Sequence, residues 1–414
     1  MPSLRQKTIR PRRLDYDADP VRIFVQIADQ PGAVFLDSAL GEDGFSILAF
    51  DPECVVDDFD QIRTWLRKNR PESAPDIGFP LGAAIGQVDY EGKLAFGLYP
   101  GLLVHRRASG EWFDVGGVAD QLDWDFEPAK PAAAGAIEFQ ADRTEAEFIA
   151  AVQRAKDWIA AGDIYQVNLS HRFKSAWPRG ASAWPFYLAL RECSPAPHAG
   201  FFNFGDRQIL SSSPEEFLKM SGQGIRTRPI KGTRPRLRDP ELDEFSRYEL
   251  ITSPKEQAEL IMITDLLRND LGQVCEFGSV QAIKLLEPEA YEHVHHLVST
   301  VIGQLRPEID HVGAFQACFP GGSITGAPKK RAMEIIAELE RSPRGVYTGA
   351  IGYFGLNDES QFNIAIRTAV VEESELHFHV GAGIVADSDP EFEYQETLHK
   401  AAGMFQAAEF LRTR

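Results

Sequence analysis

Strand-like and helix-like segments follow one another along this chain without regular alternation. Runs in which apolar and polar residues alternate, bounded by Gly, Pro or Asp, predict strands. We expect strands at 33–38, 45–50, 81–90, 102–107, 163–173, 201–204, 208–212, 293–301, 349–354, 362–371 and 376–385. Because a doubly wound parallel sheet needs a helix after almost every strand, this order favours an α+β fold.

Capping signals mark where the predicted helices begin. Thr144 and Glu147 form a capping box, and so do Ser253 and Glu256, with Pro254 at the first helical position. We expect helices at 20–32, 61–69, 144–162, from 253, from 328 and at 390–411. Apolar residues cover nearly the whole circumference of the helix after Ser253, which predicts that this helix is buried.

Charge and cysteine usage narrow the class of protein. A formal net charge of -18 over 414 residues argues against a protein that binds nucleic acid or an anionic membrane surface. The four cysteines form no C-x-x-C pair, so neither a disulfide framework nor a zinc site is indicated. No apolar run is long enough for a membrane span. We expect a cytoplasmic protein, with a transit peptide in the basic first residues as the lesser alternative.

A change in composition divides the chain. Residues 1–126 read mostly as strands, and residues 127–136 are rich in Pro and Ala, as in a connecting segment. We therefore expect an N-terminal companion region at 1–126, a linker at 127–136 and a catalytic region at 137–414.

Lys231 lies near the end of a predicted strand, beside Gly232, after a hairpin whose turn is 221–224. Four arginines at positions 226, 228, 234 and 236 surround it, and such like charge favours a neutral, nucleophilic amine. The alternative is a solvated basic edge strand that protects against aggregation.

Two helices each carry a Glu-x-x-Glu pair on one face, Glu256 with Glu259 and Glu393 with Glu396. Such faces could hold Mg²⁺, which typically takes one or two carboxylates and completes its shell with water and ligand oxygens. Two alternatives stay open, because Glu256 could simply cap its helix and Glu396 could form a surface pair with Lys400.

Other polar residues are candidates for anion binding or acid–base chemistry. The 321–329 loop fails the phosphate-loop pattern but suits a carboxylate, with a simple helix entry as the alternative. Arg367 could also bind a carboxylate, and a plain surface arginine explains it equally well. The polar face of the 163–173 strand presents Gln166, Asn168 and Ser170 to ligand or water. His293, His295 and His296 cannot share one strand face, so a single acid–base histidine is more plausible than zinc.

Six motifs match a known family, in order, across about 137–411. They are 162–170 (GDIYQVNLS), 213–215 (SPE), 229–233 (PIKGT), 265–272 (DLLRNDLG), 319–329 (FPGGSITGAPK) and 383–388 (GIVADS). The chain thus resembles the chorismate-utilising enzymes. This resemblance implies large mixed or antiparallel sheets packed as a sandwich-like core flanked by helices.

The lysine of Pro-Ile-Lys-Gly-Thr resembles the branch that forms 4-amino-4-deoxychorismate, the aminodeoxychorismate synthases, on the route to p-aminobenzoate and folate. Anthranilate synthases carry alanine at this position, and isochorismate synthases keep a lysine in different flanking sequence. Two alternatives therefore stay open. One is an isochorismate synthase in which Lys231 activates water, and the other is a catalytically silent homologue.

The resemblance also implies a role for each candidate residue. Lys231 would be the nucleophile, with Glu215 as general acid and His296 as an orienting group. Carboxylates would hold Mg²⁺, directly through Glu259 and Glu396 and through water from Glu256 and Glu393. Chorismate would be held by Gly322, Ser323, Thr325, Tyr353, Arg367, Gly383 and Lys400.

The same resemblance implies a partner. No segment reads as a glutaminase, so ammonia would come from glutamine through a separate glutaminase subunit, and no lyase segment follows for the final step to p-aminobenzoate. Leu36-Asp37-Ser38 resembles the Leu-Glu-Ser element that binds tryptophan in related enzymes, with Asp in place of Glu.

Overall fold

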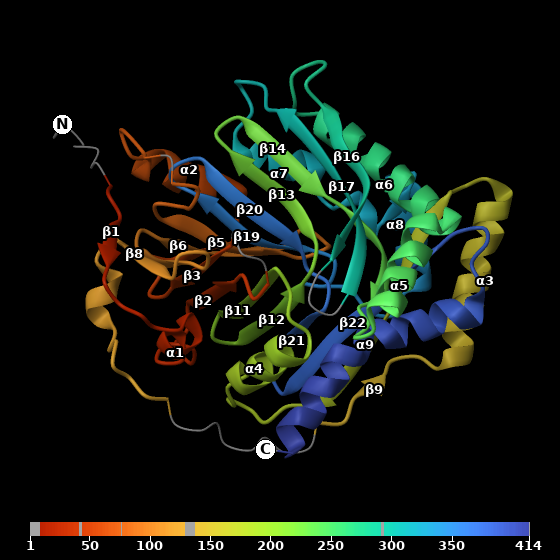
Figure 1. The fold of residues 1–414 in the computed structure, drawn as a ribbon, viewed down its shortest axis with the longest axis horizontal. Helices are drawn as coiled ribbons and strands as arrows, with labels where there is room; N and C mark the ends of the chain where they lie inside the picture. Colours follow the sequence, from red (N-terminus) through yellow and green to blue (C-terminus); the bar gives the residue numbers. More distant parts are fainter. Residues whose placement is uncertain (1–8, 41–43, 76, 129–136, 291–293, 414) are drawn as a thin grey trace.

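The computed structural model describes residues 9–40, 44–75, 77–128, 137–290 and 294–413. Two large β-sheets pack against one another, and helices lie on their outer surfaces (Figure 1). All strand pairings in these ranges are antiparallel. The predicted α+β class and sandwich-like sheets are therefore confirmed.

The first sheet has 12 strands. In spatial order they are β1 (Arg12–Leu14), β8 (Glu111–Val115), β7 (Leu102–Arg106), β3 (Phe45–Ala49), β2 (Ala33–Asp37), β11 (His198–Asn203), β12 (Arg207–Ser213), β21 (Thr368–Glu372), β22 (Glu375–Ile384), β10 (Gln166–Ala176) and β18 (Gly326–Ala327), and β9 (Gln140–Ala141) also pairs with β10.

The second sheet has 10 strands. Their order is β15 (Ile230–Pro235), β17 (Val294–Gln304), β14 (Gly224–Arg228), β13 (Glu216–Ser221), β20 (Glu359–Ile364), β19 (Ala350–Gly355), β5 (Ala83–Val88), β6 (Leu94–Tyr99) and β4 (Val55–Val56), and β16 (Gln281–Ala290) also pairs with β17.

An apolar core fills the space between the sheets, because alternate residues of the facing strands point into it. Val34 and Ile209 of the first sheet and Ile85 and Ile351 of the second are all buried in it. The 1–126 region supplies Val34 and Ile85, and the 137–414 region supplies the other two. Both regions thus build both sheets, and residues 129–136 of the expected linker lie outside the described residues.

Helices cover the outer faces of the sheets. They are α1 (Pro20–Phe24), α2 (Phe59–Asn69), α3 (Glu145–Ala161), α4 (Trp184–Cys193), α5 (Pro240–Thr252), α6 (Pro254–Gly272), α7 (His311–Cys318), α8 (Lys329–Leu339) and α9 (Pro390–Thr413). Phe24 of α1 and Phe378 of the first sheet belong to one outer cluster, and Ile62 of α2 and Phe315 of α7 to another. In the described part of the chain, no helix is long and apolar enough to cross a membrane.

Three expected elements differ in the structure. The first helix ends at Phe24 rather than near Gly32, and turns follow it. The 362–371 strand is two strands, β20 and β21, which belong to different sheets. Helix α6 is buried on one side only, since Ile261 is 46% exposed. Its apolar circumference therefore overstated its burial.

Candidate active site

Lys231 lies on β15 at a register shift opposite β17, where Gly232 has a φ of 71°. Its Nζ is 3.5 Å from the carbonyl oxygen of Ser323. A Cβ atom at Gly383 would lie 3.8 Å from this Nζ and 2.7 Å from Nε2 of Gln166. The absence of a side chain at Gly383 therefore leaves room for the amide of Gln166, and the Lys231 amine lies at contact distance from the same position.

The four arginines near Lys231 are each paired with a carboxylate. The ion pairs are Arg226–Glu216 at 2.7 Å, Arg228–Glu289, Arg234–Glu256 at 3.6 Å and Arg236–Asp243 at 2.9 Å. Their charges are therefore largely compensated. The prediction that Lys231 lies among uncompensated like charges is wrong. The carboxylates of Glu215 and Glu259 are among the groups that interact with its amine.

Glu215 is buried in the short link between β12 and β13, with 6% of its surface exposed. Burial raises the pKa of its carboxyl group, against the opposing effects of a hydrogen bond with Ser323 and the charges of Lys231 and Lys400. A carboxyl group with a raised pKa next to an amine can donate a proton near neutral pH.

Glu259 lies on α6 and Glu396 on α9, and the charge of Glu396 helps to raise the pKa of Glu259. Burial raises the pKa of Glu259, partly offset by Lys231 and Lys255. Burial also acts to raise the pKa of Glu396, but Lys400 at 2.7 Å outweighs it and the net shift is downward. The predicted Glu396–Lys400 pair is present, and Lys400 also donates to the carbonyl of Gly381 at 2.9 Å.

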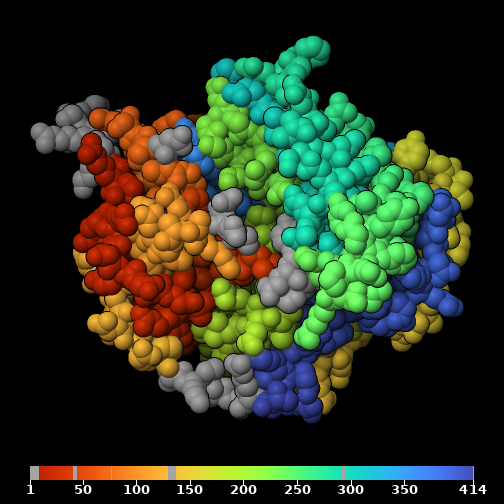
Figure 2. Space-filling view, viewed as in Figure 1, coloured from red at the N-terminus to blue at the C-terminus, as the bar shows by residue number. Residues whose placement is uncertain are grey.

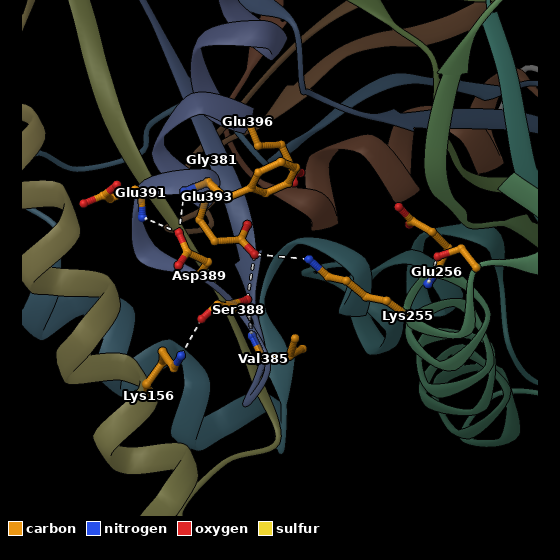
Figure 3. Close-up of polar contacts among 12 residues, drawn as sticks. Lys156, Lys255, Glu256, Gly381, Val385, Ser388, Asp389, Glu391, Glu393 and Glu396 are labelled. Atoms are coloured by element: carbon orange, nitrogen blue, oxygen red, sulfur yellow. Dashed lines mark hydrogen bonds and ion pairs between the residues drawn. The ribbon is translucent and has the colours of Figure 1, made fainter. Parts of the chain in front are cut away.

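The other two carboxylates also have protein partners, and Figure 3 shows those of Glu393, which are Ser388 and Lys255. Glu256 pairs with Arg234, and the second half of its expected capping box is absent because the Ser253 N–H donates to Leu250. Glu393 is 1% exposed, and one of its oxygens accepts from Ser388 at 2.7 Å and from Lys255 at 3.2 Å.

The residues present are compatible with a magnesium ion. No group of three or more Asp, Glu, His or Cys side chains in the described ranges could hold a metal ion by itself. Magnesium, however, commonly takes only one or two carboxylates, with water and ligand oxygens as its remaining ligands. The second oxygen of Glu393 is buried and has no hydrogen-bond partner, as expected for a group that accepts from a metal-bound water.

His296 is 3% exposed on β17. Its Nδ1 lies 3.0 Å from the Thr233 hydroxyl and 3.4 Å from the Gly232 carbonyl oxygen. Burial, with a further contribution from Arg367, lowers the pKa of His296 to about 4, so the ring is neutral at pH 7. His295 instead contacts Asp243 at 2.9 Å, and His293 lies outside the described residues.

Arg367 stands where the chain passes from one sheet to the other, with a φ of 49° that is rare for a residue with a side chain. Burial lowers the pKa of its guanidinium. Among the described residues no carboxylate lies within ion-pair distance of it. A half-buried arginine with no acidic partner can form charge-assisted hydrogen bonds with an anionic group.

The loop before α8 differs from the expected helix entry. Gly322–Ile324 forms a turn of 3-10 helix, and β18 then pairs with β10 before α8 begins. The 321–327 segment is therefore not the N-terminus of helix α8, and the expected helix entry is wrong. The hydroxyl of Thr325 donates to the carbonyl of Gly321 at 3.1 Å, which leaves Ser323 as the loop residue in contact with both Lys231 and Glu215.

Tyr353 does not join these residues. It lines a cavity of about 410 Å³ between the sheets, together with Asp37 and Ser38. Figure 2 shows this face hollowed between the N-terminal strands and the green and teal segments. Residues alternate along β19, so Ile351 and Tyr353 both point into the core between the sheets. The carboxylate of Asp37 is bound by Arg191 at 2.5 Å.

Three further polar residues, Gln166, Asn168 and Tyr347, lie near Lys231 and Gly381. A Cβ atom at Gly381 would lie 2.8 Å from both the Tyr347 hydroxyl and the side-chain oxygen of Asn168. The side-chain oxygens of Asn168 and Gln166 are buried and have no hydrogen-bond partner. The polar face of the 163–173 strand pointed to Gln166 and Asn168, whereas Tyr347 lies in a turn without periodic pattern.

Comparison with known proteins shows which family this sequence resembles. Residues 58–406 match the family of chorismate binding enzymes. Anthranilate synthase component 1 of Streptomyces coelicolor is 46% identical over 280 residues, 67% of this chain and 54% of that protein. Aminodeoxychorismate synthase component 1 of Bacillus subtilis is also 46% identical over 280 residues, 68% of this chain and 59% of that protein. The matched part thus spans less than two thirds of either relative.

Solved structures agree with this placement. Anthranilate synthase component I from Streptococcus pneumoniae has a TM-score of 0.77 at 30% identity, covering 87% of this chain and 92% of that one. The isochorismate synthase MenF from Escherichia coli has a TM-score of 0.79 at 20% identity, covering 97% and 94%, and shows the fold alone. The fold is that of the anthranilate and isochorismate synthases. The chain belongs to the family of chorismate binding enzymes.

Proposed function

We propose that this protein converts chorismate and ammonia to 4-amino-4-deoxychorismate through a covalent intermediate on Lys231. The observation that carries the proposal is that one residue, Ser323, contacts both groups: its carbonyl oxygen lies 3.5 Å from Nζ of Lys231, and it hydrogen-bonds the buried Glu215 carboxyl group. The two 46%-identical relatives carry different names, so overall similarity does not choose between their products. The lysine at position 231, where the resemblance assigns alanine to anthranilate synthases, favours aminodeoxychorismate.

The first half of the reaction joins the substrate to the enzyme. Lys231 reacts as the free amine, after its ammonium group has released a proton to solvent. Its Nζ forms a bond to C2 of chorismate, the ring double bonds shift, and the C4–O bond breaks. Glu215 gives its proton to the departing hydroxyl, which leaves as water. Lys231 is then a secondary ammonium and Glu215 a carboxylate.

The second half releases the product. Ammonia forms a bond to C4, the double bonds shift back, and the bond between C2 and Lys231 breaks, which returns the neutral amine. The new C4 ammonium gives a proton to Glu215 and so restores the acid. Neutral His296 orients the leaving hydroxyl, and the sum is chorismate plus ammonia to 4-amino-4-deoxychorismate plus water.

The two carboxylates of chorismate need separate cationic partners. Arg367 is proposed to hold the enolpyruvyl carboxylate, and Tyr347 replaces Tyr353 as its neighbouring hydroxyl. At the ring carboxylate, Glu259 and Glu396 would hold Mg²⁺, with Lys400 and the Gly383 backbone beside it. Bound magnesium supplies positive charge that neutralises this carboxylate.

The ammonia is proposed to come from a separate glutaminase subunit. Both named relatives are component 1 of a synthase, which implies a second component. Supply by a partner fits a chemistry in which ammonia, rather than glutamine, attacks C4.

A trapped intermediate tests the proposal. Wild-type protein is mixed with chorismate and magnesium without ammonium, quenched rapidly and digested. We expect an adduct of chorismate less one water on Lys231, absent from Lys231→Arg. Lys231→Ala protein that aminates C4 at the wild-type rate would reject a covalent role for the lysine. Isochorismate as the wild-type product would support water activation by Lys231 instead.

A further inference from the structure

Arg344 and Glu340 form a buried ion pair next to the candidate active site. Their side chains are 1% and 6% exposed, and the guanidinium bonds both carboxylate oxygens, at 2.8 and 2.7 Å. Glu340 also accepts from the backbone N–H and the hydroxyl of Ser170 on β10, at 2.8 and 2.9 Å. The pair therefore ties the end of α8 to the strand that carries Gln166.

The rest of the guanidinium reaches two backbone segments of the site. It donates to the carbonyl oxygen of Ile324 at 3.0 Å and to that of Asn168 at 2.8 Å. Ile324 directly follows Ser323, whose carbonyl oxygen faces the Lys231 amine. One side chain thus fixes the 322–325 loop against β10.

The same group also touches a third part of the site wall. Its guanidinium carbon lies 4.6 Å from the ring centre of Tyr90 and 5.7 Å from that of Tyr347. The flat guanidinium favours such stacking, which a lysine ammonium reproduces poorly.

A buried ion pair is a weak source of stability, because removing two charges from water costs about as much free energy as their attraction returns. The bonds of Arg344 instead converge on segments that face the substrate. We propose that Arg344 is a positioning residue that sets the 322–325 loop, and with it Ser323, opposite Lys231. This inference rests on the proposed site at Lys231 but not on the identity of the product.

Three variants separate positioning from stability. Arg344→Lys keeps the positive charge but cannot make the several parallel hydrogen bonds of the planar guanidinium. The double variant Arg344→Met with Glu340→Gln removes both charges, so that neither is left buried alone. Arg143→Met is the matched control, because Arg143 is 6% exposed and bonds the carbonyl of Leu339 beside the same helix end without reaching the loop.

We expect kcat for chorismate consumption, whatever the product, to fall about 100-fold in Arg344→Lys and in the double variant. The chorismate Kd should stay within about threefold, since Arg367 and Lys400 remain. Arg143→Met should lose thermal stability and keep its kcat. Hydrogen exchange of the 321–327 amides should accelerate in Arg344→Lys and stay unchanged in Arg143→Met.

A folded Arg344→Lys protein with wild-type kcat, or with wild-type exchange in the loop, would overturn the proposal. If the double variant does not fold, the kcat and the loop exchange of Arg344→Lys test the proposal without it. If the wild type forms another product from chorismate, the proposed function is rejected. The ratios of variant to wild-type kcat would still test whether Arg344 positions the 322–325 loop. The exchange measurement needs no turnover at all.

Discussion

At the scale of single residues, the candidate site brings buried carboxyl groups close to the amine of Lys231. Glu215 and Glu259 both have a raised pKa because of burial, and Lys231 is a cation near each of them. Local patterns in the sequence predicted Lys231, at a strand end beside Gly232, and Glu259, in a Glu-x-x-Glu pair, whereas Glu215 was assigned only through a family motif because no local pattern marks it. The sequence could not predict that each neighbouring arginine has its own carboxylate partner, since Glu289 is far along the chain from Arg228.

A substitution at Arg367 should weaken chorismate binding without lowering the free energy of unfolding. Arg367→Gln should raise KM for chorismate by about 10- to 100-fold, because a charge-assisted hydrogen bond contributes about 1.5–3 kcal/mol. The free energy of unfolding should not fall, since the change removes a half-buried cation without breaking an ion pair among the described residues. Steady-state kinetics and urea unfolding measure the two effects.

The control for this change is Arg412→Gln, an exposed arginine at the end of α9 that should alter neither quantity. An Arg367→Gln protein with unchanged KM would remove this residue from the chorismate site.

At the scale of elements, strand alternation and helix caps predicted most of the secondary structure. Thr144 caps α3 through both halves of its capping box, as predicted. The break between β20 and β21 was missed because the apolar run continues through Ala365 and Ile366, and only the positive φ of Arg367 turns the chain. The exposed Ile261 shows that periodicity gives the apolar face of a helix but not its depth.

Helices α6 and α9 should be joined by magnesium. If Glu259 and Glu396 hold the ion together, magnesium at a hundredfold excess over its Kd stabilises the fold by about 2.7 kcal/mol. The midpoint of thermal unfolding of the wild type should therefore rise with magnesium, and removal of the metal should stop turnover without unfolding the chain. Calorimetry with and without the ion checks this.

A Glu259→Gln and Glu396→Gln double variant should lose the magnesium shift, whereas Glu249→Gln on the exposed side of α5 should keep it. An equal shift in the double variant would place the ion elsewhere.

At the scale of the whole molecule, the two expected regions share one core. The 1–126 region provides β2 beside β11 and β5 beside β19. A protein of residues 137–414 alone would expose those strand edges and the apolar residues between the sheets. We expect it to be insoluble or to lack a cooperative unfolding transition, and co-expression with 1–136 to restore soluble protein. A soluble 137–414 monomer that unfolds cooperatively would contradict this.

Buried histidines should make the fold sensitive to acid. Burial lowers the pKa of His171, His198, His296 and His377 to about 4 each, from an ordinary value of 6.5. The unfolded chain therefore binds protons first, and stability is lost as the pH falls from 6.5 toward 4, by at most about 3 kcal/mol per histidine. Asp89, whose pKa is raised to about 6 by burial, opposes this loss, and so do Glu215, Glu259 and Asp270, whose pKa values burial also raises.

Urea unfolding at a series of pH values measures this slope. His377→Gln should reduce it, and His399→Gln on the exposed face of α9 should not. A free energy of unfolding that stays constant between about pH 6.5 and 4.5 would mean that these histidines are not buried in the neutral form.

The position of the new nitrogen tests the central claim most directly. The wild type is incubated with chorismate, magnesium and isotopically labelled ammonium, and the product is identified by mass spectrometry and NMR. The account predicts labelled nitrogen bonded to C4, as 4-amino-4-deoxychorismate. Label at C2, or a product without label, would contradict it.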